Sequence, residues 1–448
     1  MSSTLFSFPV LFSLLTIVIL LCRFPVHTAV ASIGLAIVLD CLEIGKEGFD
    51  LGITIYPYDI ACAILLCAGC IAIVRWRKLP SNGWWFAFGL FGLAVFNLIR
   101  GAAENGTKPA GNGIRRLTYL IVPSIAFMLL RPALRLDSAR LAKWLSLAGL
   151  VFAGIAVCRW AGVLPSPEWS SQDNFREIPR VLNAESAMLL GQAFLAVLYL
   201  QIGRGFSWWG VTLAGTLGFE LLFLQHRSVW MATIVGVTWL AIRTAGSSKR
   251  LLIGGAIGAI CALAIWSAIS PSVTNRFSTV IGENIEETEQ SNSTWAWRTK
   301  GYEEALDRTF SGSTDEIWFG PPAGRNLSGA SIASIYIHDR YVDTVVYYGI
   351  LGEILFVIWL LFVARGVFGG MALPGSQDRG GQLGRVFLQA LLLAQLTYFI
   401  PYSGGMPLGA VMGLLWVVST IPPKAKATFV LVPAGNLPTN SSRILQTA

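Results

Sequence analysis

The polar stretch that begins at residue 270 gives way to apolar sequence in His338-Asp-Arg-Tyr-Val-Asp-Thr-Val-Val-Tyr-Tyr-Gly-Ile-Leu-Gly-Glu-Ile-Leu355. Earlier in this stretch lie an acidic cluster, 283–289, and the segment Ile317-Trp-Phe-Gly-Pro-Pro-Ala-Gly324. Nearly all of the chain on either side is apolar. A long polar insert in such a chain is the expected place for chemistry on the aqueous side of a membrane.

The composition is that of a membrane protein. Hydrophobic residues make up 54% of the chain and charged residues 13%, whereas soluble domains carry roughly 25% charged residues. The apolar runs are 5–22, 26–40, 56–74, 84–99, 117–131, 144–163, 184–202, 207–225, 228–244, 251–269, 343–364, 386–402 and 404–421. They do not alternate as β-barrel strands do. We therefore predict an all-α polytopic membrane protein with about 12–13 transmembrane helices and one long periplasmic loop.

Lys and Arg residues set the expected orientation, because positively charged loops stay on the cytoplasmic side. This leaves six connections for the opposite side, which are 41–55, 100–116, 164–183, 226–227, 270–342 and 402–404. Several of them also contain arginine, among them Arg116, Arg180 and Arg227. An anionic ligand at the outer face explains outward arginines. Arginines that snorkel at helix ends are the alternative explanation.

Two residues are candidates for catalysis. His338 stands where the chain re-enters the membrane, and the ordinary pKa of histidine, about 6.5, suits a general base. Arg227 lies between two apolar runs, where a charge is usually functional or paired, and guanidinium groups bind phosphate bidentately. Arg180 precedes another outward helix and could lie beside Arg227. The alternatives are a solvated loop histidine and carboxylate partners for the arginines, such as Glu185 or Glu220.

Aromatic residues are frequent in the polar stretch: Trp295, Trp297, Tyr302, Trp318, Tyr336 and Tyr341. Aromatic faces stack on sugar rings, although Trp and Tyr also collect at membrane interfaces. The sequence contains no nucleotide-binding loop, no HExxH and no paired Cys/His spacing, so we expect no metal and no cofactor. The net charge of +8 lies largely in short loops and does not predict a nucleic-acid partner.

At His338 the sequence resembles the bacterial O-antigen ligases and the related Wzy-type polysaccharide polymerases. The spacing His338-Asp339, nine residues, Gly349, two residues, Gly352 is similar to the His-polar-x9-Gly-x-x-small pattern of the ligases. Three further segments are similar, namely His226-Arg227-Ser228-Val-Trp230, Trp297-Arg298 and Trp318-Phe-Gly-Pro-Pro-Ala-Gly324. The resemblance covers residues 207–365.

The resemblance implies a metal-independent, GT-C-like glycosyltransferase in the bacterial inner membrane, with its active site facing the periplasm. Its donor is then an undecaprenyl-diphosphate-linked oligosaccharide. The acceptor is lipid A–core for a ligase, or another lipid-linked glycan for a polymerase that extends O-antigen, capsule or exopolysaccharide. Ligase and polymerase share these motifs, so both stay open. A lipid-linked glycan flippase is the alternative from another class.

The resemblance also implies roles for the candidate residues. His338 accepts the proton of the attacking hydroxyl, and Arg227 stabilises the diphosphate leaving group. Contacts to the diphosphate or sugar are expected from Arg180, Arg116, Arg298, Trp297 and Tyr341. The expected units are N-terminal transmembrane helices over 1–206, a ligase/polymerase core over 207–365 that includes the periplasmic loop 270–342, C-terminal transmembrane helices over 366–422 and a cytoplasmic tail over 423–448.

Overall fold

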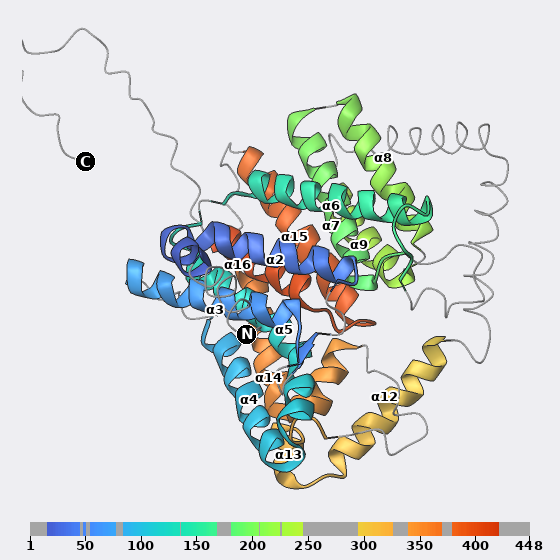
Figure 1. The fold of residues 1–448 in the computed structure, drawn as a ribbon. Helices are drawn as coiled ribbons and strands as arrows, with labels where there is room; N and C mark the ends of the chain where they lie inside the picture. Colours follow the sequence, from blue (N-terminus) through green and yellow to red (C-terminus); the bar gives the residue numbers. More distant parts are fainter. Residues whose placement is uncertain are drawn as a thin grey trace, which may run out of the picture.

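The computed structural model describes residues 16–44, 48–50, 54–77, 84–134, 136–167, 181–205, 207–224, 226–244, 294–325, 339–369 and 379–420. Its helices are α2 (Pro25–Cys41), α3 (Pro57–Trp76), α4 (Trp84–Asn105), α5 (Thr107–Leu130), α6 (Ser138–Trp160), α7 (Ala184–Arg204), α8 (Trp208–Phe223), α9 (Arg227–Arg243), α12 (Thr294–Phe310), α13 (Thr314–Phe319), α14 (Arg340–Phe368), α15 (Arg379–Phe399) and α16 (Met406–Thr420) (Figure 1). A short antiparallel ribbon joins β1 (Phe49–Asp50) to β2 (Thr54–Ile55).

The chain is an all-α polytopic membrane protein, as predicted. Within the described ranges, six helices are long and apolar enough to cross a membrane: α3, α4, α5, α6, α7 and α14. The helices α2 and α16 are apolar but shorter. The predicted run 251–269 and most of the run 5–22 lie outside the described residues.

The prediction of a loop at 100–116 is wrong. The helix α4 continues to Asn105 and α5 begins at Thr107, so a single residue, Gly106, makes the turn with φ 87°. A positive φ costs glycine little, because it has no Cβ. The expected 270–342 loop also contains helical structure, since α12 and α13 lie within it. Both segments are polar and lie outside the apolar runs, as predicted. A polar sequence can still form a helix, which is why the prediction of loops was wrong.

The described ends of several membrane helices lie together at one end of the helix bundle. The Tyr58 hydroxyl donates to Asp40 at 3.1 Å, which joins the start of α3 to the end of α2. The Asn183 amide donates to the same carboxylate at 3.3 Å. A ring nitrogen of His226 lies 2.9 Å from the carbonyl oxygen of Leu182, which joins the starts of α9 and α7. These contacts place the end of α2 and the starts of α3, α7 and α9 on one side of the bundle.

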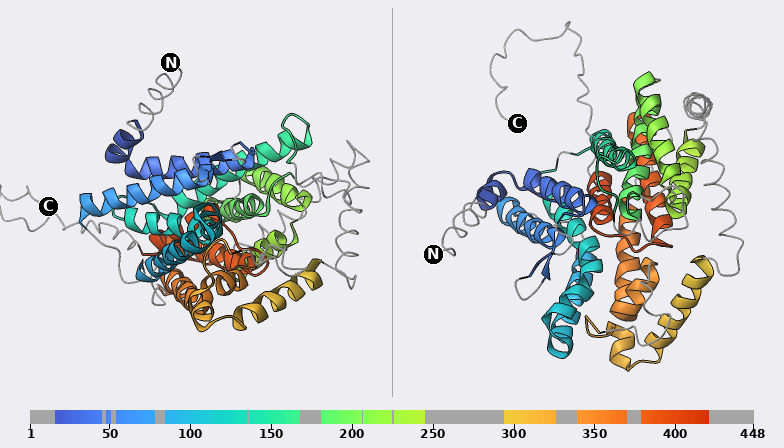
Figure 2. Two further views of the ribbon diagram at one scale, coloured as in Figure 1. Left: turned by 60° about the horizontal axis from the view of Figure 1, so that its bottom comes forward. Right: turned by 45° about the vertical axis from the view of Figure 1, so that its right-hand side comes forward.

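The helix α16 is buried at the centre of the bundle, between α5, α14 and α15 (Figure 2). The hydroxyl of Ser124 on α5 donates to the carbonyl of Gly409 at 2.6 Å. A Cβ atom at Gly413 would lie 2.8 Å from the Cα of Ser124, so only glycine permits this approach. The close packing fixes the turn before α16, residues 403–405, against α5.

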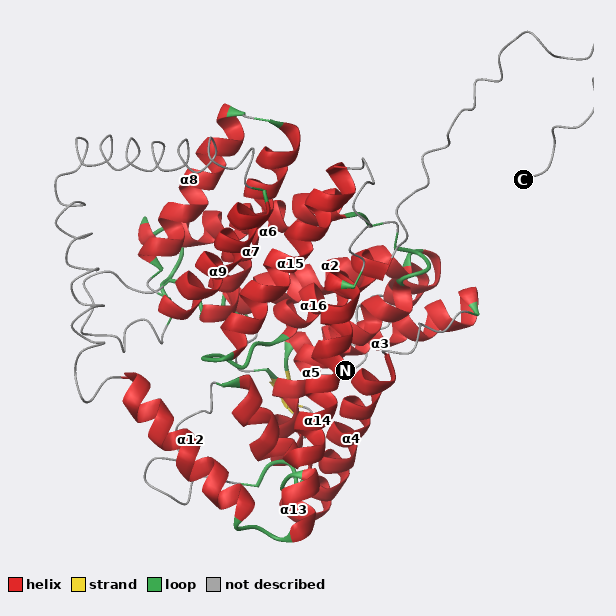
Figure 3. Cartoon of the chain, turned by 180° about the vertical axis from the view of Figure 1, so that it is seen from behind, coloured by secondary structure: helices red, strands yellow, loops and turns green. Residues whose placement is uncertain are grey.

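A second close contact holds the segment after α13 on the membrane helices. Both Figure 1 and Figure 3 place α12 and α13 at the far end of α4, away from α6 and α8. The Asn97 side chain donates to the Phe319 carbonyl at 2.6 Å, and Arg100 donates to the Gly320 carbonyl at 3.0 Å. A Cβ atom at Gly349 would lie 2.5 Å from the carbonyl carbon of Trp318. Gly349 has φ 68° and kinks α14 at this contact.

Candidate functional site

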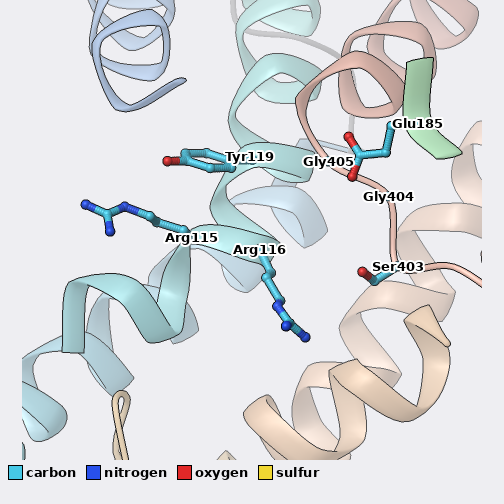
Figure 4. A pocket seen from close by; sticks show the side chains of 7 residues that line it. All are labelled: Arg115, Arg116, Tyr119, Glu185, Ser403, Gly404 and Gly405. Atoms are coloured by element: carbon cyan, nitrogen blue, oxygen red, sulfur yellow. The ribbon is translucent and has the colours of Figure 1, made fainter. Parts of the chain in front are cut away.

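A cavity of about 210 Å³ lies between α5, the start of α7 and the turn before α16. Three elements line it (Figure 4). The helix α5 provides two arginines and a tyrosine, α7 provides a glutamate, and the turn before α16 provides a serine and two glycines. The lining residues are Arg115, Arg116, Tyr119, Glu185, Ser403, Gly404 and Gly405.

Arg115 is bound to a carboxylate of the neighbouring helix. Its Nε donates to both oxygens of Asp59 at 3.1 Å, and Nη2 lies 2.9 Å from Oδ2. The Tyr119 hydroxyl donates to Oδ1 of Asp59 at 2.7 Å. The same carboxylate accepts the backbone N–H of Tyr56 at 2.9 Å, which closes a capping box at the start of α3. Asp59 thus orients Arg115 and Tyr119 at one edge of the cavity.

Arg116 belongs to a group of three charged side chains. Its Nη1 lies 3.2 Å from Oδ1 of Asp343, and the other carboxylate oxygen lies 3.0 Å from Nη1 of Arg340. Arg340 and Asp343 are fully buried, whereas the Arg116 side chain is 29% exposed. Two guanidinium groups therefore share the carboxylate of Asp343, and only Arg116 among the three reaches the cavity. Buried charges of this kind persist only when they are paired and hydrogen-bonded.

Arg340 also fixes the opposite wall of the cavity. It donates to the carbonyl oxygens of Ser403 and Gly404 in the turn before α16. Since Arg340 is the first residue of α14, this contact joins the start of α14 to the start of α16. The ion pairs of Asp343 extend the connection to α5. The cavity walls on α5 and the turn are thus held together through the first turn of α14.

Glu185 is the carboxylate of the cavity. It lies in the first turn of α7, whose N-cap residue Asn183 accepts the backbone N–H of Ser186 at 2.8 Å. A Cβ atom at Gly405 would lie 2.7 Å from Oε2 of Glu185, so the glycine makes room for this carboxylate. In Figure 4 the carboxylate points toward the 404–405 turn, on the opposite side of the cavity from Arg115.

The start of α14 explains part of the His-polar pattern. The Asp339 side chain accepts the backbone N–H groups of Tyr341 at 2.8 Å and Val342 at 3.0 Å, and so caps α14. Asn and Ser cap helices in the same way. Burial raises the pKa of the Asp339 carboxyl above its usual value, although the two backbone hydrogen bonds oppose this rise. His338 itself lies outside the described residues.

The structure places the other predicted site residues as follows. Arg116 lines the cavity. Arg227 is the half-buried first residue of α9, next to the His226 contact with α7. Tyr341 packs edge-on against Phe356 at a centroid distance of 5.9 Å, within the hydrophobic cluster. Trp297 and Arg298 belong to α12, and Arg180 lies outside the described residues.

Sequence reasoning missed Arg340 and Asp343 entirely. The available signal was a pair of opposite charges three residues apart at the start of an apolar helix, a spacing that places them on one helix face. Glu185 entered only as a partner for Arg180 or Arg227. Its place in the cavity comes from the packing of α7 against α16.

In the part of the chain that the structure describes, no group of three or more His, Cys, Asp and Glu side chains could hold a metal ion. The arrangement instead offers guanidinium groups, a carboxylate and hydroxyls. Guanidinium groups bind phosphate oxygens, and carboxylates accept hydrogen bonds from hydroxyls. The chemistry that fits the cavity is recognition of an anion together with a hydroxylated group.

No family model matches the chain. A UPF0060 membrane protein from Ectopseudomonas mendocina (strain ymp) is similar to part of it, with 32% identity over 108 residues. The match covers 94% of that protein and 24% of this chain. Over those 108 residues the chain belongs to the UPF0060 membrane proteins.

Proposed function

We propose that this multi-pass protein is a glycosyltransferase of the bacterial inner membrane, which transfers a glycan from undecaprenyl diphosphate to an acceptor hydroxyl at the periplasmic face. The observation that carries the proposal is the cavity at the end of the bundle. There Arg116 of α5 meets the first turn of α14 through Asp343. The residue that precedes the α14 cap Asp339 is His338, the proposed general base.

The arginines bind the diphosphate of the donor. A guanidinium group in a site of low dielectric stabilises the charge that develops on a departing diphosphate. Arg116 serves this role in the cavity, and Arg227 and Arg180 contribute from the neighbouring helix starts. Because Asp343 fixes Arg116 before the donor binds, little reorganisation is needed during the reaction.

His338 receives the proton from the acceptor hydroxyl as the oxygen attacks the anomeric carbon. The new glycosidic bond forms while the bond to the diphosphate oxygen breaks, which inverts that carbon. The proposed reaction uses no metal and no covalent intermediate on the protein. Attachment to lipid A–core makes the protein an O-antigen ligase. Transfer to a second lipid-linked repeat unit makes it a Wzy-type polymerase.

The distribution of buried charge favours a transferase over a lipid-linked glycan flippase. A flippase is expected to carry charges in the middle of its spans. Among the described residues, the buried ionisable side chains at this face are Arg159, Glu220, His226, Arg340 and Asp343. Each lies in the first or last turn of its helix or caps it. Glu353, with one buried carboxylate oxygen, lies further inside α14.

Reconstitution tests the proposal. The purified protein in proteoliposomes is given an undecaprenyl-diphosphate oligosaccharide and lipid A–core, and the products are separated by size. We expect transfer by the wild type, and a loss of at least about 100-fold for His338→Ala. The exposed His27 is a control, because His27→Ala leaves the outer face unchanged. Equal transfer by His338→Ala and wild type would remove the catalytic assignment. Elongated lipid-linked glycan instead of modified lipid A–core would identify a polymerase.

A further inference from the structure

The negative charge of Glu185 does not suit a cavity that binds only a diphosphate. Its carboxylate shares the cavity with Arg115 and Arg116, and a bound anion would be repelled by it. In the described part of the chain, no hydrogen bond or ion pair engages this carboxylate. The charge of Arg340 attracts this carboxylate, but since no described group donates a hydrogen bond to it, its oxygens can accept one from a ligand.

The fold holds Glu185 in a fixed position. The start of α7 is capped by Asn183, and Asn183 also donates to Asp40 at the end of α2. The hydroxyl of Ser186 on α7 lies 3.2 Å from the sulfur of Cys41, the last residue of α2. Gly405 then allows the carboxylate to lie against the turn before α16. These contacts order the side chain before any ligand arrives, which reduces the entropic cost of binding.

The cavity therefore has two chemically different sides. The α5 side presents the guanidinium group of Arg116, which suits phosphate oxygens, whereas the guanidinium group of Arg115 is engaged by Asp59. The α7 side presents the acceptor oxygens of Glu185, which suit sugar hydroxyls, because each hydroxyl has one proton to donate. The volume of about 210 Å³ has room for one sugar ring beside Arg116.

We infer that Glu185 forms a subsite for the acceptor sugar, in which its carboxylate accepts a hydrogen bond from a hydroxyl of the ring to be glycosylated. This inference rests on the proposed function and adds the residue that positions the acceptor beside the diphosphate. The competing explanation is that Glu185 only balances the charge shared by Arg116, Asp343 and Arg340. The two explanations predict opposite effects on the two substrates.

The test compares the steady-state kinetics of Glu185→Ala and Glu185→Gln with those of the wild type in proteoliposomes. The donor is an undecaprenyl-diphosphate oligosaccharide and the acceptor is lipid A–core. Loss of a hydrogen bond to a charged group corresponds to a rise of roughly tenfold or more in KM for the acceptor in Glu185→Ala. The KM for the donor is expected to stay unchanged or to fall, because the lost negative charge repels the diphosphate. Glu185→Gln keeps one acceptor oxygen and is expected to show a smaller rise.

The matched control is Glu220→Gln, which alters another buried carboxylate near the same face that does not line the cavity. An unchanged acceptor KM in both Glu185 variants overturns the inference and leaves the proposed function standing. A lower donor KM together with an unchanged acceptor KM in Glu185→Gln also overturns it, because that result shows only the removal of a repelling charge.

A binding measurement keeps the inference testable if the wild type shows no transfer. Fluorescently labelled core oligosaccharide is titrated into the full-length protein in detergent. Tight binding by the wild type and weakened binding by Glu185→Ala support the subsite even though the proposed reaction has failed. Equal binding by both proteins, or binding by neither, overturns it. Size-exclusion chromatography shows that each variant is folded.

Discussion

Replacement of Asp343 by Asn is the sharpest test of the buried charge group. The carboxylate lies 3.2 Å from Arg116 and 3.0 Å from Arg340. At an effective dielectric constant of about 20, each pair attracts by roughly 5 kcal/mol before desolvation is subtracted. Removal of one partner leaves the fully buried Arg340 without its carboxylate, and such a change typically costs about 3–5 kcal/mol of folding stability.

The assay is unfolding of the purified protein in mixed micelles with increasing SDS, followed by circular dichroism. We expect Asp343→Asn to unfold at a clearly lower SDS fraction, with a free energy of unfolding about 3–5 kcal/mol smaller. The control is Asp315→Asn on α13, because Asp315 is exposed and a surface change there alters stability by less than about 0.5 kcal/mol. If Asp343→Asn unfolds like the control, the three side chains do not form a buried charge group.

Three further variants probe the contacts around the site. Gly349→Ala places a Cβ 2.5 Å from the Trp318 carbonyl carbon at a positive φ, so we expect a loss of about 1–3 kcal/mol in the same unfolding assay and faster proteolysis after α13. Asp339→Ala removes the α14 cap and is expected to cost about 1 kcal/mol, whereas Asp339→Asn keeps it. Burial raises the folded-state pKa of Asp339, so ionisation of this carboxyl opposes folding. Stability therefore falls as the pH rises from the unfolded-state pKa to the folded-state pKa. A pH series of the unfolding assay should show this fall for the wild type and not for Asp339→Asn. Gly405→Ala pushes against the Glu185 carboxylate and is expected to raise the acceptor KM, while Gly154→Ala, in open space on α6, does not. If Asp339→Asn loses stability with pH as the wild type does, the burial of the Asp339 carboxyl is contradicted. If the two glycine variants have equal kinetics, the contact between Gly405 and Glu185 is contradicted.

The motif around His338 separates into folding and chemical parts. Asp339 caps α14, and Gly349 allows the backbone of α14 to lie against residues 318–320. The two glycine-containing segments that resemble the ligases, at 318–324 and at 349–352, therefore form one contact in space. His338 lies outside the described residues, and its role as general base is tested by the His338→Ala variant.

The local sequence predicted the membrane helices. Hydrophobic runs predict spans because the cost of burying polar groups in lipid depends on each residue and its near neighbours. Alternation then follows, because successive spans reverse direction. Local sequence did not predict the helical structure at 100–116. The hydrogen bonds that Asn97 and Arg100 of α4 donate to the end of α13 join segments more than 200 residues apart, so local sequence does not reveal them.

The site depended on tertiary structure for a similar reason. Arg116 was predicted as an outward arginine, but Asp343, which binds it, lies 227 residues further along the chain. Arg340 reaches the turn before α16 only because α5 and α16 pack closely through Ser124 and Gly409. Apolar runs and outward arginines could be read residue by residue from the sequence. Which charges share one cavity was decided by helix packing, because ion pairs and hydrogen bonds act over a few ångströms and require groups from distant segments to meet.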